Sequence, residues 1–163
     1  MRDADGVDPI SPNGTIVSID EHDRRVWIGL LSRAEPRHLA ELYNAAKLDA
    51  PFVWLRAPEI GLVMARGRAG GDGAPFNLGE LSATRCALRL ESGPTGHACV
   101  LGRDKEHARR AALVDALMQT HRAEDLRRRI LAPLEAAERA RREARSGKAA
   151  ATRVEFFTLS REA

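Results

Sequence analysis

The sequence predicts one α+β domain in which helices flank a mainly antiparallel sheet of about four strands. Apolar residues recur at helical spacing near the start of the chain and again after residue 104. The segment between them alternates apolar and polar residues, or forms short apolar runs bounded by glycine and proline. Helices that enclose a block of consecutive strands are typical of the α+β class.

Length and composition are those of a globular domain. The chain has 163 residues, of which 44% are hydrophobic and 4% aromatic, so its core volume must come from aliphatic side chains. We expect residues 1–20 to form a flexible extension without a signal peptide, and residues 21–163 to form the domain. The absence of a long apolar run predicts a cytoplasmic protein with no membrane segment. Cys86 and Cys99 are expected to be free thiols.

The first two helices are predicted to form an N-terminal αα-hairpin. Ser18 and Glu21 have the spacing of a capping box, and a helix is expected to follow them. Pro36 suits the first turn of a second helix, and the short connection favours a hairpin. Trp27 on the first helix and Trp54 on the first strand are expected to anchor the core.

Four strands are expected in the middle of the chain. Short apolar or alternating runs predict strands over 52–56, 60–66, 84–91 and 95–101, and the last two are expected to pair as a hairpin. The segment 67–79 holds five glycines and a proline, which predicts a long loop.

The C-terminal third is predicted to be helical. Helices are expected over 105–119 and from about residue 123, with an interruption at Pro133 and an end at Gly147. Residues 152–159 form an extended, apolar and β-prone tail, TRVEFFTL. We expect this tail to add a strand to the sheet or to dock on another subunit.

Positive charge is concentrated in this helical third. The net charge is only +3, but residues 103–148 hold 13 Arg and Lys against 8 Asp and Glu. Such a region is compatible with nucleic acid, a nucleotide or an acidic protein surface, whereas interleaved charge on solvated helices accounts for most of the arginines. A basic nucleic-acid-binding module is one alternative function and a purely structural interaction module is another, but few aromatics and mixed-sign helices argue against nucleic acid.

The most informative segment is the turn that begins at Gly102 and leads into a helix. Gly102 allows a sharp turn, and Asp104 can cap the helix by accepting a bond from a free N–H. Arg103 and Lys105 place two cations beside the same helix end. Free N–H groups, the helix dipole and cations together suit an anion such as phosphate. The alternative is a capped helix with solvated charges.

His107 and Asp115 are further candidates for ligand or subunit contact. The helix dipole disfavours a cationic His107, and a neutral imidazole can accept a proton or bind a ligand, although local hydrogen bonding is the alternative role. On a helical wheel, Asp115 falls among alanines. It is expected to be a buried or interfacial carboxylate bonded to backbone or arginine, or to orient a ligand or a partner's arginine.

The glycine-rich segment carries the last candidates, Arg66, Gly70 and Gly71. It lacks the common phosphate-loop patterns and precedes a strand, so we interpret it as a mobile or partner-binding loop. No catalytic motif, metal site or cofactor is predicted.

The stretch GRDKEHARRAALVDALMQ closely resembles the equivalent segment of the PhnG family, the small G subunits of bacterial carbon–phosphorus lyase systems. The resemblance continues in order and covers residues 25–160. Its other segments are WIGLL at 27–31, EIGLV at 59–63, APL at 132–134 and RVEFFT at 153–158.

The resemblance implies a subunit of organic phosphonate catabolism with PhnH-, PhnI-, PhnJ- and PhnL-like partners. In such systems the G subunit is required, with H, I and L, to transfer the ribose triphosphate of ATP to methylphosphonate. Adenine is released and alpha-D-ribose 1-methylphosphonate 5-triphosphate is formed. The resemblance transfers no catalytic residue to this chain, so we expect a non-catalytic or co-catalytic subunit.

Overall fold

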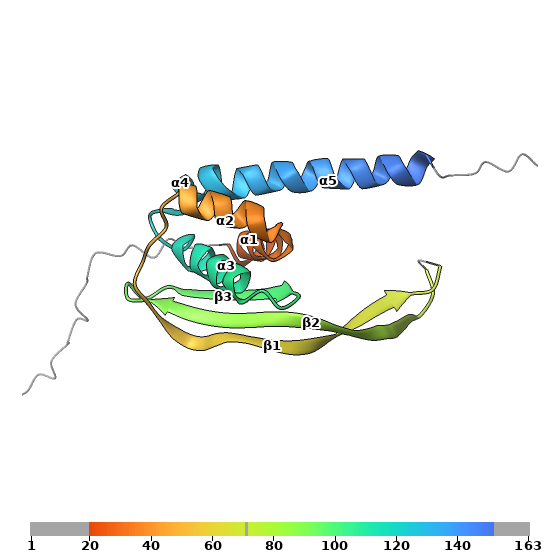
Figure 1. Ribbon diagram of the computed structural model, residues 1–163, viewed down its shortest axis with the longest axis horizontal. Helices are drawn as coiled ribbons and strands as arrows, with labels where there is room; N and C mark the ends of the chain where they lie inside the picture. The colour runs from red at the N-terminus through yellow and green to blue at the C-terminus, as the bar shows by residue number, and fades with distance from the viewer. Residues whose placement is uncertain (1–19, 71, 152–163) are drawn as a thin grey trace, which may run out of the picture.

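A three-stranded antiparallel sheet carries helices on one face in the computed structural model, which describes residues 20–70 and 72–151 (Figure 1). The elements are α1 (Glu21–Arg33), α2 (Pro36–Ala45), β1 (Phe52–Arg68), β2 (Pro75–Leu90), β3 (Thr95–Leu101), α3 (Lys105–Leu117), α4 (Ala123–Leu126), the π-helical turn η1 (Arg127–Leu131) and α5 (Ala132–Ala151). The α+β class is confirmed, whereas the described residues form three strands instead of the expected four or so. The predicted tail lies outside the described residues, as does the extension apart from its last residue.

The strand count differs because the first two predicted strands are one continuous strand, β1. Pro58 does not break it, since β1 is an edge strand whose outer N–H groups need no ladder partner. Register shifts between Trp54 and Arg56, and between Arg56 and Glu59, absorb the extra residues as bulges. Trp54 lies in this irregular stretch and is 39% exposed, so its prediction as a core anchor is wrong.

The loop is shorter than the predicted 67–79, because strands occupy both of its ends. β1 continues to Arg68 and β2 begins at Pro75. A further register shift, between Ala65 and Arg66, leaves Leu78 on β2 as an extra residue between paired positions. The predicted hairpin between the last two strands is confirmed as β2 and β3, and Gly93 in its turn has φ +109°.

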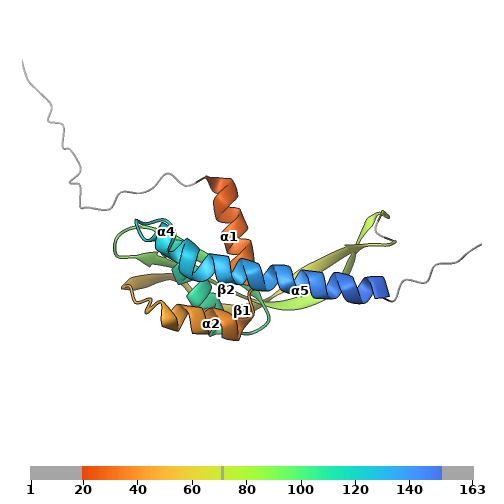
Figure 2. The ribbon, with the colours of Figure 1, turned by 90° about the horizontal axis from the view of Figure 1, so that it is seen from above.

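The N-terminal helices do not form the predicted αα-hairpin, although both are present. Helix α1 is capped by Asp20, whose side chain accepts from the His22 N–H, rather than by the predicted Ser18. Pro36 occupies the first turn of α2 as predicted. Seen from above, the two helices run in clearly different directions (Figure 2), so each packs on α3 instead of along the other.

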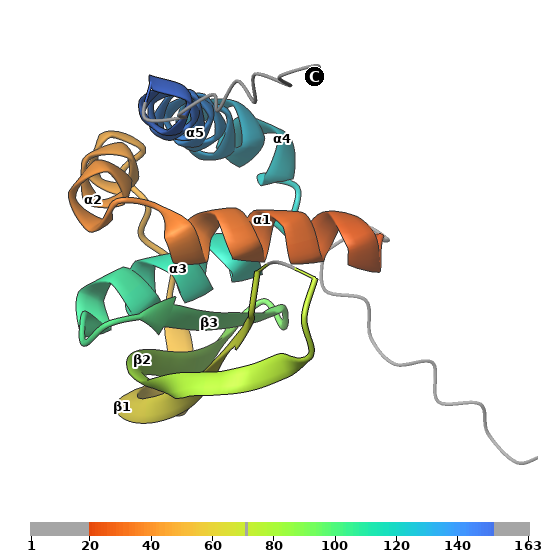
Figure 3. The same cartoon turned by 90° about the vertical axis from the view of Figure 1, so that its right-hand side faces the viewer.

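The helices are stacked in layers above one face of the sheet (Figure 3). Helix α3 packs on β2 and β3, and α1 and α2 pack on α3. The segment α4, η1 and α5 lies over α1 and α2, and Gly147 does not end α5 as predicted. Trp27, as predicted, is buried between these layers. In the described ranges, no helix has the length and apolar character needed to cross a membrane.

Close contact between α3 and the sheet depends on Gly96 of β3. A Cβ placed there would overlap the backbone carbonyl oxygen of Ala112. Because a backbone oxygen cannot turn aside as a side chain can, any larger residue must separate α3 from β3.

We therefore predict that Gly96→Ala lowers the free energy of unfolding by about 3 kcal/mol. The matched control is Gly147→Ala on α5, where an added Cβ meets nothing. This control is expected to stabilise the helix by up to about 1 kcal/mol. Urea denaturation followed by circular dichroism measures both, and equal stability of Gly96→Ala and the native chain would contradict the packing argument.

Candidate functional site

The turn into α3 is held firmly against β2. Gly102 has φ +95°, a conformation that suits glycine. Its N–H donates to the Ser82 carbonyl at 2.8 Å, and its carbonyl accepts from the Thr84 hydroxyl at 2.9 Å. Thr84 is fully buried, so the turn is fixed by the core.

One polar side chain of this turn caps the helix, whereas the two cations are exposed to solvent. Asp104 caps α3 by accepting from the His107 N–H at 2.8 Å. Arg103 and Lys105 are exposed. Within the described part of the chain, neither cation has a hydrogen-bond or ion-pair partner. They are available to a ligand or another subunit, but nothing else converges on them.

His107 points away from these cations into the core. Its side chain is buried, and Nε2 lies 2.8 Å from the Leu31 carbonyl near the end of α1. A carbonyl only accepts, so Nε2 carries the proton and donates it. The imidazole therefore joins α3 to α1 by a hydrogen bond between residues 76 positions apart, rather than by the local bond of the alternative.

Asp115 is the most heavily bonded side chain in the structure's interior. Its carboxylate is fully buried and accepts from Arg24 Nε at 3.1 Å and Nη2 at 2.8 Å. It also accepts from the Trp27 indole N–H at 2.9 Å and the His97 backbone N–H at 2.9 Å. Four donors compensate the cost of burying the charge.

The same cluster covers the outer edge of β3. Arg24 Nη2 and Gln119 Nε2 both donate to the Thr95 carbonyl, at 2.8 and 2.7 Å. Together with the bond from His97 to Asp115, these contacts occupy edge groups that would otherwise pair with another strand. The hydrogen bond from Arg24 to Asp115 raises the pKa of the Arg24 guanidinium.

The glycine-rich candidates lie at the far end of the β1–β2 hairpin. Arg66 is exposed on β1, and Gly70 has φ +60° in the turn. Arg68 holds this turn by donating to the Gly73 carbonyl at 3.1 Å. Gly71 lies outside the described residues. The segment is the tip of a strand pair.

This hairpin extends past the end of β3 as an arm, defined here as residues 62–68 and 75–82 (Figure 1). Large apolar side chains are exposed along it: Leu62 is 61% exposed and Leu78 is 63% exposed. The others are Met64, Phe76 and Leu81. Apolar patches of this kind mark interaction surfaces in soluble proteins.

Sequence reasoning also missed a basic cleft beside α5, called here the α5 cleft. It has a volume of about 540 Å³ and lies between β3, the end of α1 and α5. Arg33, Arg141, Arg142 and Arg145 line it against a single carboxylate, Glu138. The spacing of the arginines along α5 could have indicated this cleft. From the sequence we instead interpreted them as part of a solvated helical face.

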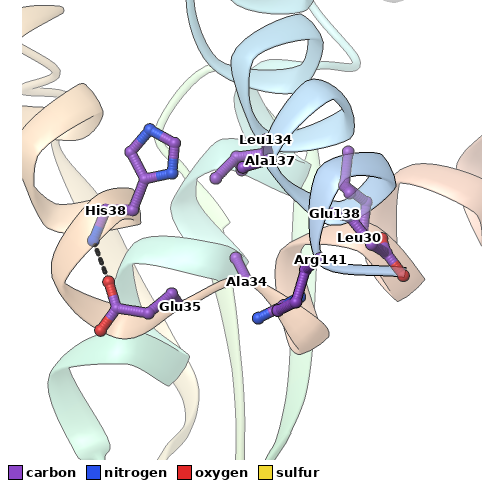
Figure 4. Close-up of a pocket in the computed structure, with 8 residues that line it drawn as sticks. All are labelled: Leu30, Ala34, Glu35, His38, Leu134, Ala137, Glu138 and Arg141. Atoms are coloured by element: carbon purple, nitrogen blue, oxygen red, sulfur yellow. Dashed lines mark hydrogen bonds between the residues drawn. The ribbon is translucent and has the colours of Figure 1, made fainter. Parts of the chain in front are cut away.

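The packing of α5 on α1 shapes this cleft. Glu138 accepts from Arg142 at 2.6 Å and from Arg33 at 3.2 Å, and these bonds lower the pKa of its carboxyl. Arg141 donates to the Arg33 carbonyl at 3.1 Å. A smaller hollow of about 150 Å³ adjoins the cleft (Figure 4), and its polar groups include the Glu35 carboxylate, which caps α2 through the His38 N–H at 2.7 Å.

Neither the cysteines nor the carboxylates form a metal centre in the described ranges, where no three His, Cys, Asp or Glu residues are suitably grouped. The two thiols are free as predicted. Cys99 is exposed and lines the α5 cleft, whereas burial raises the pKa of the Cys86 thiol to about 11.

Comparison with known proteins gives two findings. Residues 22–162 match the model of a family described as "Phosphonate metabolism protein PhnG". The chain is also 44% identical over 142 residues to a protein of Rhizobium meliloti (strain 1021), named "Alpha-D-ribose 1-methylphosphonate 5-triphosphate synthase subunit PhnG". That alignment covers 85% of this chain and 88% of the relative.

We predict that Asp115→Asn lowers the free energy of unfolding by roughly 3 kcal/mol, because an amide has one acceptor oxygen for four donors. Asp104→Asn is the matched control on the same helix, and it should change stability little because asparagine caps as well as aspartate. Thermal unfolding of the two variants makes the comparison. Equal stability would show that the Asp115 cluster is dispensable.

Proposed function

The chain belongs to the PhnG family, and from this we propose that it is a subunit of an alpha-D-ribose 1-methylphosphonate 5-triphosphate synthase in organic phosphonate catabolism. It is needed, with PhnH-, PhnI- and PhnL-like partners, to transfer the ribose triphosphate of ATP to methylphosphonate. A PhnJ-like subunit belongs to the same assembly. The family match and the relative's name support this proposal.

One observation supports a subunit role: the side chains that could perform chemistry instead hold the fold together. His107 donates to a backbone carbonyl, and Asp115 is saturated by Arg24, Trp27 and the His97 N–H. Neither group is free to move a proton for a substrate. We therefore assign the chemistry to partner subunits and assembly to this chain.

The arm provides a second, independent argument for the subunit role. A two-stranded ribbon is marginal in water, and this one also exposes apolar side chains on its surface. Packing against another subunit would remove that surface from water at roughly 25 cal/mol per Å². The arm is thus suited to an assembled state.

The test is co-expression of a tagged chain with the four partner subunits, followed by chromatography of products from ATP and methylphosphonate. We expect a recovered complex that releases adenine and forms the ribose phosphonate adduct, and no turnover by the chain alone. Recovery of the tagged chain without any partner would contradict the proposal.

Within that complex, we predict that the double variant Arg103→Ala and Lys105→Ala reduces adduct formation about tenfold, as loss of a charge-assisted contact would. Both side chains are exposed and unpaired in the described structure, so stability should stay within about 0.5 kcal/mol. Arg25→Ala, another exposed arginine, is the control. Full activity of the double variant would remove these residues from any contact role.

A further inference from the structure

Two segments project from the same end of the molecule. The arm extends beyond the end of β3, and the C-terminal half of α5 extends beyond the helices on which its first turns pack. In the side view α5 lies above and the arm below (Figure 1), and the view from above shows both directed toward one end (Figure 2).

An apolar strip runs along β1 into the arm, on the face of the sheet that the helices cover. The strip consists of Ile60, Leu62 and Met64, which alternate along β1 and are 40%, 61% and 50% exposed. Ile60 pairs with Thr84, a residue on the sheet face that the helices cover. Residues two apart on a strand share a face, so the strip continues the helix-covered face of the sheet past the end of β3.

The upper segment presents positive charge. Arg142 and Arg145 line the α5 cleft, and Glu138 is the single carboxylate lining it. Glu138 is already bonded to Arg142 and Arg33. In the chain as described, no ion pair involves Arg145. The cleft therefore keeps an excess of guanidinium groups that can bind carboxylates in pairs of hydrogen bonds.

The α5 cleft lies where the two segments diverge. Its walls combine the arginines of α5 with Cys99 and Leu101 of β3, and Leu101 is 67% exposed. An occupant that satisfies both sides must be apolar toward the sheet and acidic toward α5. A small anion would leave the apolar strip in water, and a second copy of this surface would oppose arginines to arginines.

We propose that α5 and the arm clamp an acidic, amphipathic segment of a partner subunit. The apolar face of that segment packs on Ile60, Leu62 and Met64, and its carboxylates pair with Arg142 and Arg145. This assignment rests on the proposed function, because the partner is another subunit of the same assembly.

The experiment measures association of the full chain with the purified partner subunits at several salt concentrations. We expect Arg142→Glu with Arg145→Glu to weaken association more than about tenfold. The matched control is Arg139→Glu, on the same helix but outside the cleft lining, and it should change affinity less than about twofold.

The arm is tested by a second pair of variants. Leu62→Ser lies in the strip and should weaken association about tenfold without altering its salt dependence. Val53→Ser is the control, because Val53 lies outside the arm, pairs with the exposed Arg89 and is itself 49% exposed. Unfolding midpoints equal to that of the native chain confirm that the exposed substitutions leave the fold intact.

Cys99 reports occupancy directly. Iodoacetamide at about pH 8 should alkylate Cys99 in the free chain and leave the buried Cys86 untouched, and partner binding should slow the reaction. Full-strength assembly of the charge-reversal and Leu62 variants would reject the clamp while leaving the proposed function intact. Protection of Cys99 by inorganic tripolyphosphate alone, or by raising the concentration of the chain alone, would also reject it. Failure of the native chain to assemble would reject both proposals.

Discussion

The buried carboxylate of Asp115 joins three elements that are distant in sequence. It receives the guanidinium and indole donors of α1 and a backbone donor of β3, while it belongs to α3. A buried charge with a removed partner is very costly, so alternative packings of α1 are excluded. Gly96 allows the close approach of α3 and β3 that this arrangement requires. The cluster therefore specifies one arrangement of helices on the sheet.

Side chains cover backbone groups at one edge of the sheet, so contacts with other proteins are directed to the opposite edge. Arg24, Gln119 and Asp115 occupy backbone groups at the edge of β3, whereas β1 forms the opposite edge and continues into the arm. The core beneath the helices is buried in the described structure. The arm differs, because its large apolar side chains are exposed. A buried core and an arm with exposed apolar side chains together fit the proposed role as a subunit, in which partners would cover the arm.

The sequence alone predicts the parts of the structure that depend on local pattern. Helical spacing, the cap at Asp104, the turn at Gly102 and the β2–β3 hairpin all follow from neighbouring residues. The continuity of β1 does not, because whether Pro58 breaks a strand depends on which edge the strand occupies. Burial of Asp115 is visible on a helical wheel, but its partner Arg24 is 91 residues away and no local pattern identifies it.

A double-mutant cycle between Arg24→Gln and Asp115→Asn tests the central claim most directly. The free energies of unfolding of the native chain, both single variants and the double variant give the coupling between the two side chains. We predict a coupling of about 2 kcal/mol, because the pair shares one buried hydrogen-bond network. The exposed pair Arg37 and Glu41, changed to glutamines, should show less than about 0.5 kcal/mol. Additive effects at Arg24 and Asp115 would contradict the claim that their contact fixes the helices on the sheet.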